Sequence, residues 1–110
     1  MVFGSFFDGI YIVRLSSSTM KPNGNLVKIA SRNDGHNAIE GPCIWNGGNG
    51  YFYLLASFDL CCNGINSTYS IRYGRSQSLT GPYLDKSGKS LLDGGGTILA
   101  SSNGNVIGPG

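Results

Sequence analysis

Glu40 is the residue of this chain whose type and surroundings best fit acid catalysis. It follows Ala38-Ile39, precedes Gly41-Pro42 and stands at the start of a predicted strand. If that strand is the innermost of its sheet, the carboxylate is partly withdrawn from water, and desolvation raises the pKa of a carboxyl group. A general acid needs such a raised pKa to keep its proton near neutral pH. The alternative is a strand-end glutamate that faces solvent.

A second set of polar side chains lies in residues 57–69, after the most strand-like run of the chain. Aromatic faces stack on sugars, while amides and hydroxyls hydrogen-bond to sugar hydroxyl groups. We therefore expect this loop to lie beside Glu40 and to bind substrate. The candidate residues are Phe58, Cys61, Cys62, Asn63, Asn66, Ser67 and Thr68. The alternative is a loop held together by its own side chains.

Two other chemistries are not supported by the sequence. His36 is the only histidine, it lies in a polar stretch, and no Gly-x-Ser-x-Gly segment accompanies it, so we expect a surface histidine and no Ser/His/Asp triad. Gly94-Gly95-Gly96 lacks the Gly-Lys-Ser/Thr ending and the following helix of a phosphate-binding loop.

The three cysteines are Cys43, Cys61 and Cys62. Adjacent cysteines seldom bridge each other, because their Cα atoms are too close for ordinary disulfide geometry. No second pair of Cys or His stands at a zinc-ligand spacing, so no metal ligands are predicted. We expect small buried thiols in a loop, and the alternative is a disulfide from Cys43 to one of the adjacent pair.

Composition predicts an all-β fold. Gly is 18 of 110 residues, charged residues are 13%, and six Tyr, five Phe and one Trp are present, as in a chain of short strands joined by tight turns. The net charge is +2 with scattered basic residues, so nucleic acid is not an expected partner. No apolar run reaches the roughly 20 residues that span a bilayer, and residues 1–5 do not resemble a signal peptide.

The pattern of apolar runs and turn residues predicts about three strands, then a four-stranded antiparallel unit, then the start of another. The expected strands are 2–6, 9–15, 26–30, 40–45, 51–58, 69–76, 97–100 and 105–107, with the last two forming a hairpin. Four-stranded units in series are typical of propeller blades. We divide the chain into 1–36 (end of one blade), 37–101 (one full blade) and 102–110 (start of the next). Such a piece is not expected to be a stable monomer.

Several segments in a fixed order resemble one enzyme family. They are Asn37-Ala38-Ile39-Glu40-Gly41-Pro42, residues 57–69, Gly74-Arg75-Ser76, Leu79-Thr80-Gly81-Pro82-Tyr83, Asp85-Lys86-Ser87-Gly88 and Gly94-Gly95-Gly96-Thr97. Together they resemble the endo-α-1,5-arabinanases of glycoside hydrolase family 43, which are five-bladed β-propellers. Such a propeller needs many more than 110 residues, so the resemblance implies a fragment of about one and a half to two blades.

The resemblance implies an inverting glycosidase in which Glu40 is the general acid. It also implies an Asp general base from the first blade and a second Asp that tunes the acid, and neither has a counterpart here. An inverting enzyme holds its acid and base about 6.5–9.5 Å apart, so this chain alone is expected to be inactive or nearly so.

Asp8 and Asp59 are the acids that could substitute for the missing base. The resemblance places Asp8 at a position that varies between Ser and Asp, where we expect a hydrogen bond in a turn or at the cleft edge, with substrate contact as its candidate role. Asp59 follows Phe58 at the end of a strand, where we expect a loop cap.

The resemblance further implies arabinan or an arabino-oligosaccharide as the partner, with no nucleic acid and no membrane, and an extracellular location. Gly108-Pro109-Gly110 resembles the family's Gly-Pro-Gly-His segment, whose His helps to hold a metal ion, commonly calcium; the printed sequence stops before it. No cofactor is expected within the 110 residues. Alternatives are an exo-acting arabinofuranosidase or xylosidase of the same family, a non-catalytic carbohydrate-binding relic, and a structural β-domain.

Overall fold

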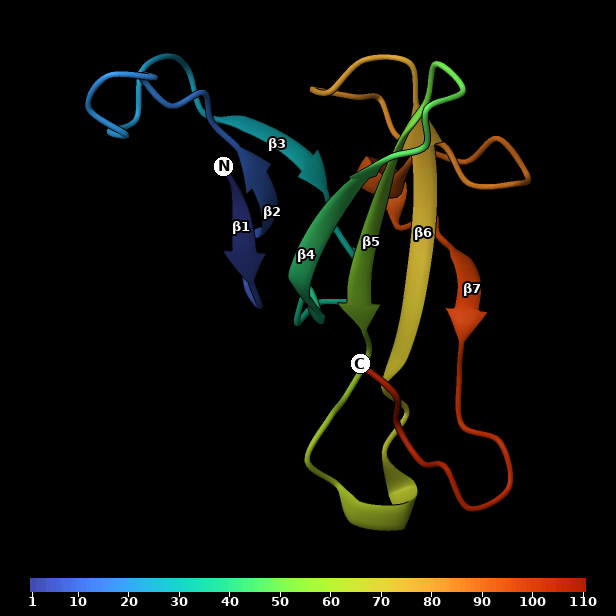
Figure 1. Ribbon diagram of the computed structural model, residues 1–110. Helices are drawn as coiled ribbons and strands as arrows, with labels where there is room; N and C mark the ends of the chain where they lie inside the picture. Colours follow the sequence, from blue (N-terminus) through green and yellow to red (C-terminus); the bar gives the residue numbers. More distant parts are fainter.

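Two antiparallel β-sheets make up the computed structural model, which describes residues 1–110 (Figure 1). The first sheet has three strands in the order β1-β2-β3, and the second has four in the order β4-β5-β6-β7. The strands are β1 (Val2–Ser5), β2 (Gly9–Ile12), β3 (Val27–Ala30), β4 (Ile39–Asn46), β5 (Phe52–Phe58), β6 (Ser70–Ser76) and β7 (Thr97–Ala100). Two short 3-10 helices, η1 (Gly64–Asn66) and η2 (Leu91–Asp93), complete the elements. The all-β prediction is confirmed.

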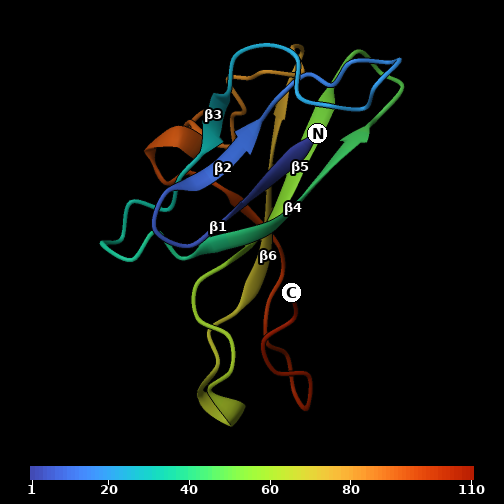
Figure 2. The same ribbon diagram turned by 90° about the vertical axis from the view of Figure 1, so that its left-hand side faces the viewer.

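The two sheets pack on each other with the core between them. β1 and β2 contact β4, while η2 contacts β3, so the first sheet lies along one side of the second (Figures 1 and 2). The core contains Ile10, Ile12, Ile29, Ala30, Ile39, Leu54, Ala56, Phe58, Tyr83 and Leu91. Burial of this apolar surface is the main favourable term that holds the sheets together.

The second sheet is apolar on both faces, but only one face is covered. Along β5 the side chains alternate, so that Leu54 and Ala56 enter the core while Tyr53 and Leu55 point to the opposite face. Trp45, Tyr53, Leu55, Tyr73 and Leu99 line a shallow apolar hollow on that open face. Trp45 is 58% exposed. An open apolar face of this kind is typical of one unit in a stack of repeats.

No helix in the structure has the length and apolar character needed to cross a membrane.

Two predicted strands differ in the structure. The second strand ends at Ile12, and Leu15 makes only an isolated bridge to Pro22. The expected terminal hairpin was wrong: Thr97–Ala100 pairs with β6, and residues 105–107 contribute only a bridge between Asn103 and Val106. The reason is that two backbone hydrogen bonds between Asn103 and Val106 close a tight turn, which leaves no paired length for a strand.

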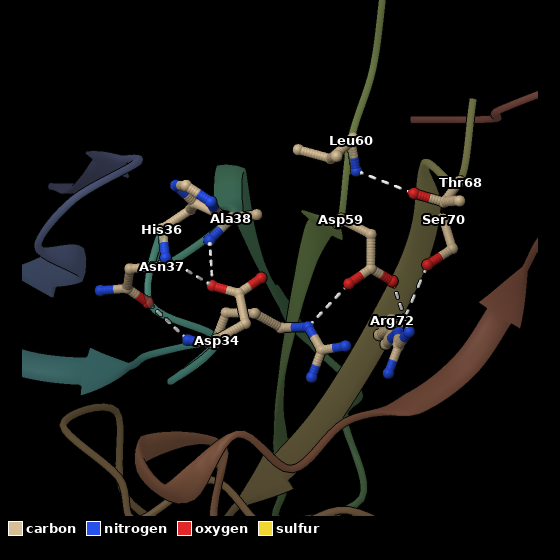
Figure 3. Close-up of polar contacts among 10 residues, drawn as sticks. Asp34, His36, Asn37, Ala38, Asp59, Leu60, Thr68, Ser70 and Arg72 are labelled. Carbon is tan, nitrogen blue, oxygen red and sulfur yellow. Dashed lines mark hydrogen bonds and ion pairs between the residues drawn. The ribbon is translucent and has the colours of Figure 1, made fainter. Parts of the chain in front are cut away.

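Asp59 ties the segment between the sheets to β6. Its carboxylate accepts from Arg32 Nε at 2.7 Å and from Arg72 Nη2 at 2.6 Å, and its side chain is 18% exposed (Figure 3). The Arg72 guanidinium also lies 5.2 Å from the centre of the Phe58 ring. The expected loop cap at Asp59 was therefore wrong: the carboxylate is ion-paired, and Thr68 Oγ1 accepts from Leu60 N in the loop instead.

Replacement of Asp59 by Ala is predicted to lower the free energy of unfolding by about 1–3 kcal/mol, because it leaves two partly buried guanidinium groups without their acceptor. Urea unfolding of the protein measures the change. Asp93→Ala is the control, because Asp93 is exposed and has no ion pair in the structure. Equal stability of the two variants would contradict this role for Asp59.

Asp85 organises the turn that leads from β6 to β7. The Ser87 hydroxyl and the backbone N–H groups of Gly96, Lys89 and Ser87 donate to its carboxylate and lower its pKa to about 2, against the burial that raises it. A carboxyl whose pKa is lower in the folded state than in the unfolded state stabilises the fold above its unfolded pKa.

This contribution is therefore predicted to be complete above pH 3.8 and to be lost as the pH falls toward about 2. In Asp85→Asn, the part of the fall in unfolding free energy that is due to this carboxyl should be absent. Unfolding free energies of both proteins, measured across this range, check the prediction. Parallel curves for the two proteins would show that Asp85 does not contribute in this way.

Candidate active site

A β-bulge fixes the direction of the strand just after Glu40. Glu40 pairs with Ser57 and Cys43 pairs with Leu55, so three steps along β4 match two steps along β5. Gly41 has φ +58°, a conformation that glycine adopts readily, and Pro42 lies on an edge strand, where its missing N–H breaks no ladder. Bulges are frequent next to active sites because they redirect a side chain. Because of the bulge at Gly41-Pro42, the direction of the Glu40 side chain does not follow from the alternation of side chains along the rest of β4.

Hydrogen bonds to side-chain oxygens, and not strand pairing, hold the segment just before β4. Asn37 Oδ1 accepts from Ser31 Oγ at 3.0 Å and from Arg32 N. Asp34 Oδ1 accepts from the backbone N–H groups of Ala38 and His36 (Figure 3). Burial raises the pKa of Asp34, but these N–H donors more than offset it, and the pKa is lowered overall. The entry to β4 is therefore fixed two residues before Glu40.

Glu40 itself is half-buried and contacts two hydroxyl groups. Tyr69 Oη donates to Glu40 Oε1 at 2.6 Å, and Ser5 Oγ donates to Glu40 Oε2 at 3.2 Å. Burial raises the pKa of Tyr69, and the hydrogen bond to Glu40 raises it further, so Tyr69 stays a donor at neutral pH. The two contacts come from different sheets, because Ser5 ends β1 and Tyr69 precedes β6.

No lysine or arginine lies within 4 Å of the Glu40 carboxylate in these 110 residues. An ion pair would favour the charged form of the carboxyl group, whereas a hydroxyl group can donate to a carboxylate and also accept from a carboxylic acid. The site therefore accommodates Glu40 in either protonation state. That is what a group requires if it gives up a proton and regains it in each turnover.

Cys61, in the loop that follows β5, has a raised pKa. The neighbouring Cys62 thiol is the main cause, and burial and the negative charge of Glu40 add to it. The three cysteines are free; Cys43 and Cys62 are exposed and Cys61 is half-buried, with the Cys61 and Cys62 sulfurs in contact. The expectation of buried thiols was therefore wrong, and the alternative of a bridge from Cys43 does not occur.

The remaining loop candidates make hydrogen bonds within the loop itself. Ser67 Oγ donates to Leu60 O at 2.9 Å, and Asn63 Nδ2 donates to Asn66 O at 3.5 Å. Asn63 and Asn66 are exposed, so their side chains remain accessible to a ligand. Their substrate contacts stay predictions.

Phe58, Asp8 and His36 do not join this group. Phe58 is 0% exposed, and its ring is packed in the core, so it offers no free face to a sugar; this corrects the stacking role expected of it. Asp8 is exposed, accepts from Tyr11 Oη at 2.8 Å, and pairs with Lys28 at 3.2 Å, which gives it a hydrogen bond at a turn. His36 lies on the surface, as expected.

Tyr69 and Ser5 are the contacts of Glu40 that the sequence did not reveal. Tyr69 closes the Asn-Ser-Thr-Tyr end of the loop, but nothing in the sequence says which way its hydroxyl points. Ser5 lies 35 residues from Glu40 and reaches it only because β1 packs on β4. The Gly-Ser-Phe-Phe segment gives no signal of that contact.

Comparison with known proteins adds the context of this site. The profile described as "Glycosyl hydrolases family 43" matches residues 3–110. The extracellular endo-α-(1→5)-L-arabinanase 1 of Bacillus subtilis is 58% identical over 110 residues, which are 100% of this chain and 34% of the relative. The extracellular exo-α-(1→5)-L-arabinofuranosidase ArbA of Cellvibrio japonicus is 37% identical over 121 aligned residues, which are 100% of this chain and 35% of that protein.

A solved structure shows the same fold. The family 43 endo-arabinanase from Bacillus licheniformis superposes with a TM-score of 0.92 at 55% identity, and the alignment covers 99% of this chain and 37% of that one. The chain thus spans about a third of the length of the relatives it matches. Everything that depends on the other two thirds of such a protein lies outside the geometry described above.

Proposed function

This chain belongs to glycosyl hydrolase family 43 and folds as part of its β-propeller, and on this premise we propose that it is part of an arabinan-degrading enzyme. The proposed reaction is hydrolysis, within the polymer, of the α-1,5 bonds that join L-arabinofuranosyl units. The observation that carries the proposal is Glu40, held beside a bulge by hydroxyl partners alone, in a chain 58% identical to an endo-arabinanase.

In the proposed mechanism Glu40 is the general acid. Its proton moves to the glycosidic oxygen as the bond from that oxygen to the anomeric carbon breaks, and a water molecule attacks the anomeric carbon from the opposite face. A second carboxylate must take a proton from that water. Within this chain Asp59 is committed to two arginines and Asp8 to Lys28 and Tyr11, so the base is assigned to a part of the propeller beyond these residues.

The family resemblance also implies a calcium ion in the whole propeller. No step of the proposed mechanism uses this ion. The 110 residues contain no group of three His, Cys, Asp or Glu side chains that could hold a metal ion. Gly108-Pro109-Gly110 has no side-chain donor of its own. The residues present therefore do not fit the ion by themselves, and ligands from other segments would have to supply the site.

An exo-acting enzyme is the second candidate, because one relative is named as an exo-arabinofuranosidase and is 37% identical. The higher identity to the endo-acting relative favours the endo reaction. Secretion is proposed on the same basis, since both of these relatives are named as extracellular. Arabinan or an arabino-oligosaccharide is the proposed substrate in either case.

The direct test places these 110 residues in the Bacillus subtilis endo-arabinanase in place of the segment that they match, which gives a chimera with the remaining two thirds of the propeller. The chimera is predicted to release reducing ends from debranched arabinan, mainly as oligosaccharides. Glu40→Gln should reduce kcat by about 100-fold or more, because glutamine cannot donate a catalytic proton. The 110-residue chain, assayed beside the chimera, should release none.

A matched control is Asp93→Asn in the chimera, which makes the same exchange of a carboxyl for an amide at an exposed residue without an ion pair and should leave kcat unchanged. Chromatography of the products separates the two modes of attack: a range of oligosaccharides indicates endo action, and arabinose or one short product indicates the exo reaction. A folded chimera whose Glu40→Gln variant is as active as the parent would refute the assignment of the acid.

A further inference from the structure

Tyr69 is the group that determines how the Glu40 carboxyl is presented. Its hydroxyl donates to Glu40 Oε1 at 2.6 Å, the shorter of the two contacts that the carboxylate makes. An oxygen that accepts a short hydrogen bond from a phenol is a poor place for the carboxyl proton, because the proton and the donor would compete for the same lone pairs. The proton of the acid form is then favoured on the other oxygen, Oε2.

The second oxygen has a partner that is compatible with carrying the proton. Ser5 Oγ donates to Oε2 at 3.2 Å when Glu40 is charged, and the serine hydroxyl can turn and accept when Oε2 is protonated. Ser5 is exposed, so its contact with Oε2 is open to solvent, whereas the contact between Tyr69 and Oε1 is partly buried. The two oxygens of Glu40 are therefore in different environments.

The ring of Tyr69 is held from its other side by the end of the chain. Gly108 and Gly110 pass so close to Ser67 and Tyr69 that a Cβ atom at either glycine would collide with these side chains. The C-terminal segment runs back beside the loop between β5 and β6 (Figures 1 and 2). This packing restricts the position of the Tyr69 ring, which carries the hydroxyl that contacts Glu40.

From these contacts we infer that Tyr69 is a positioning residue for the proposed acid: it keeps Glu40 Oε1 as an acceptor, so that the catalytic proton is carried by Oε2. The inference rests on the proposed function. In turnover the proton leaves Oε2 for the glycosidic oxygen as that bond breaks, and the resulting carboxylate accepts from Tyr69 and Ser5. In this role Tyr69 gives up no proton.

The test is Tyr69→Phe in the chimera, which removes the hydroxyl and keeps the ring. We expect kcat on arabinan to fall about tenfold, the usual scale of one lost hydrogen bond to a charged group, with KM changed less than about twofold. The unequal effects on kcat and KM are the readout, because a loss of packing alone would not be confined to kcat.

Tyr73→Phe is the matched control, because Tyr73 is a half-exposed β6 tyrosine whose hydroxyl makes no hydrogen bond in the structure. It should leave kcat and KM unchanged. If Tyr69→Phe instead keeps kcat within about twofold, or raises KM as much as it lowers kcat, the inference is wrong and the ring acts only through packing. An inactive but folded parent chimera would count against the proposed function.

A second measurement is independent of activity. In a crystal structure of the Tyr69→Phe chimera, the Glu40 carboxylate should turn away from the orientation that it has in the parent chimera, whereas in Tyr73→Phe it should keep that orientation. An unchanged Glu40 carboxylate in Tyr69→Phe would overturn the inference.

Discussion

The pairing of β4 with β5 is the constraint from which the geometry of the site follows. The ladder runs from Asn46 and Phe52 to Ile39 and Phe58, and it contains one extra residue on β4 at Gly41-Pro42. Because side chains alternate along a strand, a shift by one residue would exchange the core face and the open face. The bulge accommodates that extra residue between Glu40 and Cys43 while Leu54 and Ile39 remain in the core.

Two carboxylates stand at the same end of this ladder and have opposite surroundings. Asp59 follows the last residue of β5 and lies between Arg32 and Arg72, where it joins the linker between the sheets to the second sheet. Glu40 lies at the start of β4, and its carboxylate accepts hydrogen bonds only from hydroxyl groups. An acid that is proposed to exchange a proton and an acid that stays ion-paired need different surroundings, and the strand ends provide both within a few residues. Asp59 contributes to the fold, and Glu40 remains available for chemistry.

The sequence predicts the parts of this arrangement that depend on local pattern. The alternation in residues 51–58 and the turn residues around them are sufficient to indicate β5 and its neighbours, and the Ile-Glu-Gly-Pro segment singles out Glu40. The contacts from Ser5 and Tyr69 could not be read in this way, because they depend on how two sheets pack and on where a loop returns. The prediction that Phe58 stacks on a sugar was wrong for the same reason. Until the covering sheet is known, the sequence does not tell whether an aromatic residue at a strand end faces the core or the solvent.

The most direct test of the account is a crystal structure of the Glu40→Gln chimera with a bound arabino-oligosaccharide. A bridging glycosidic oxygen should lie within hydrogen-bond distance of one atom of the residue-40 amide, while Tyr69 Oη contacts the other atom. A sugar bound elsewhere on the propeller, with residue 40 touching no bridging oxygen, would contradict the claim that these 110 residues supply the catalytic acid.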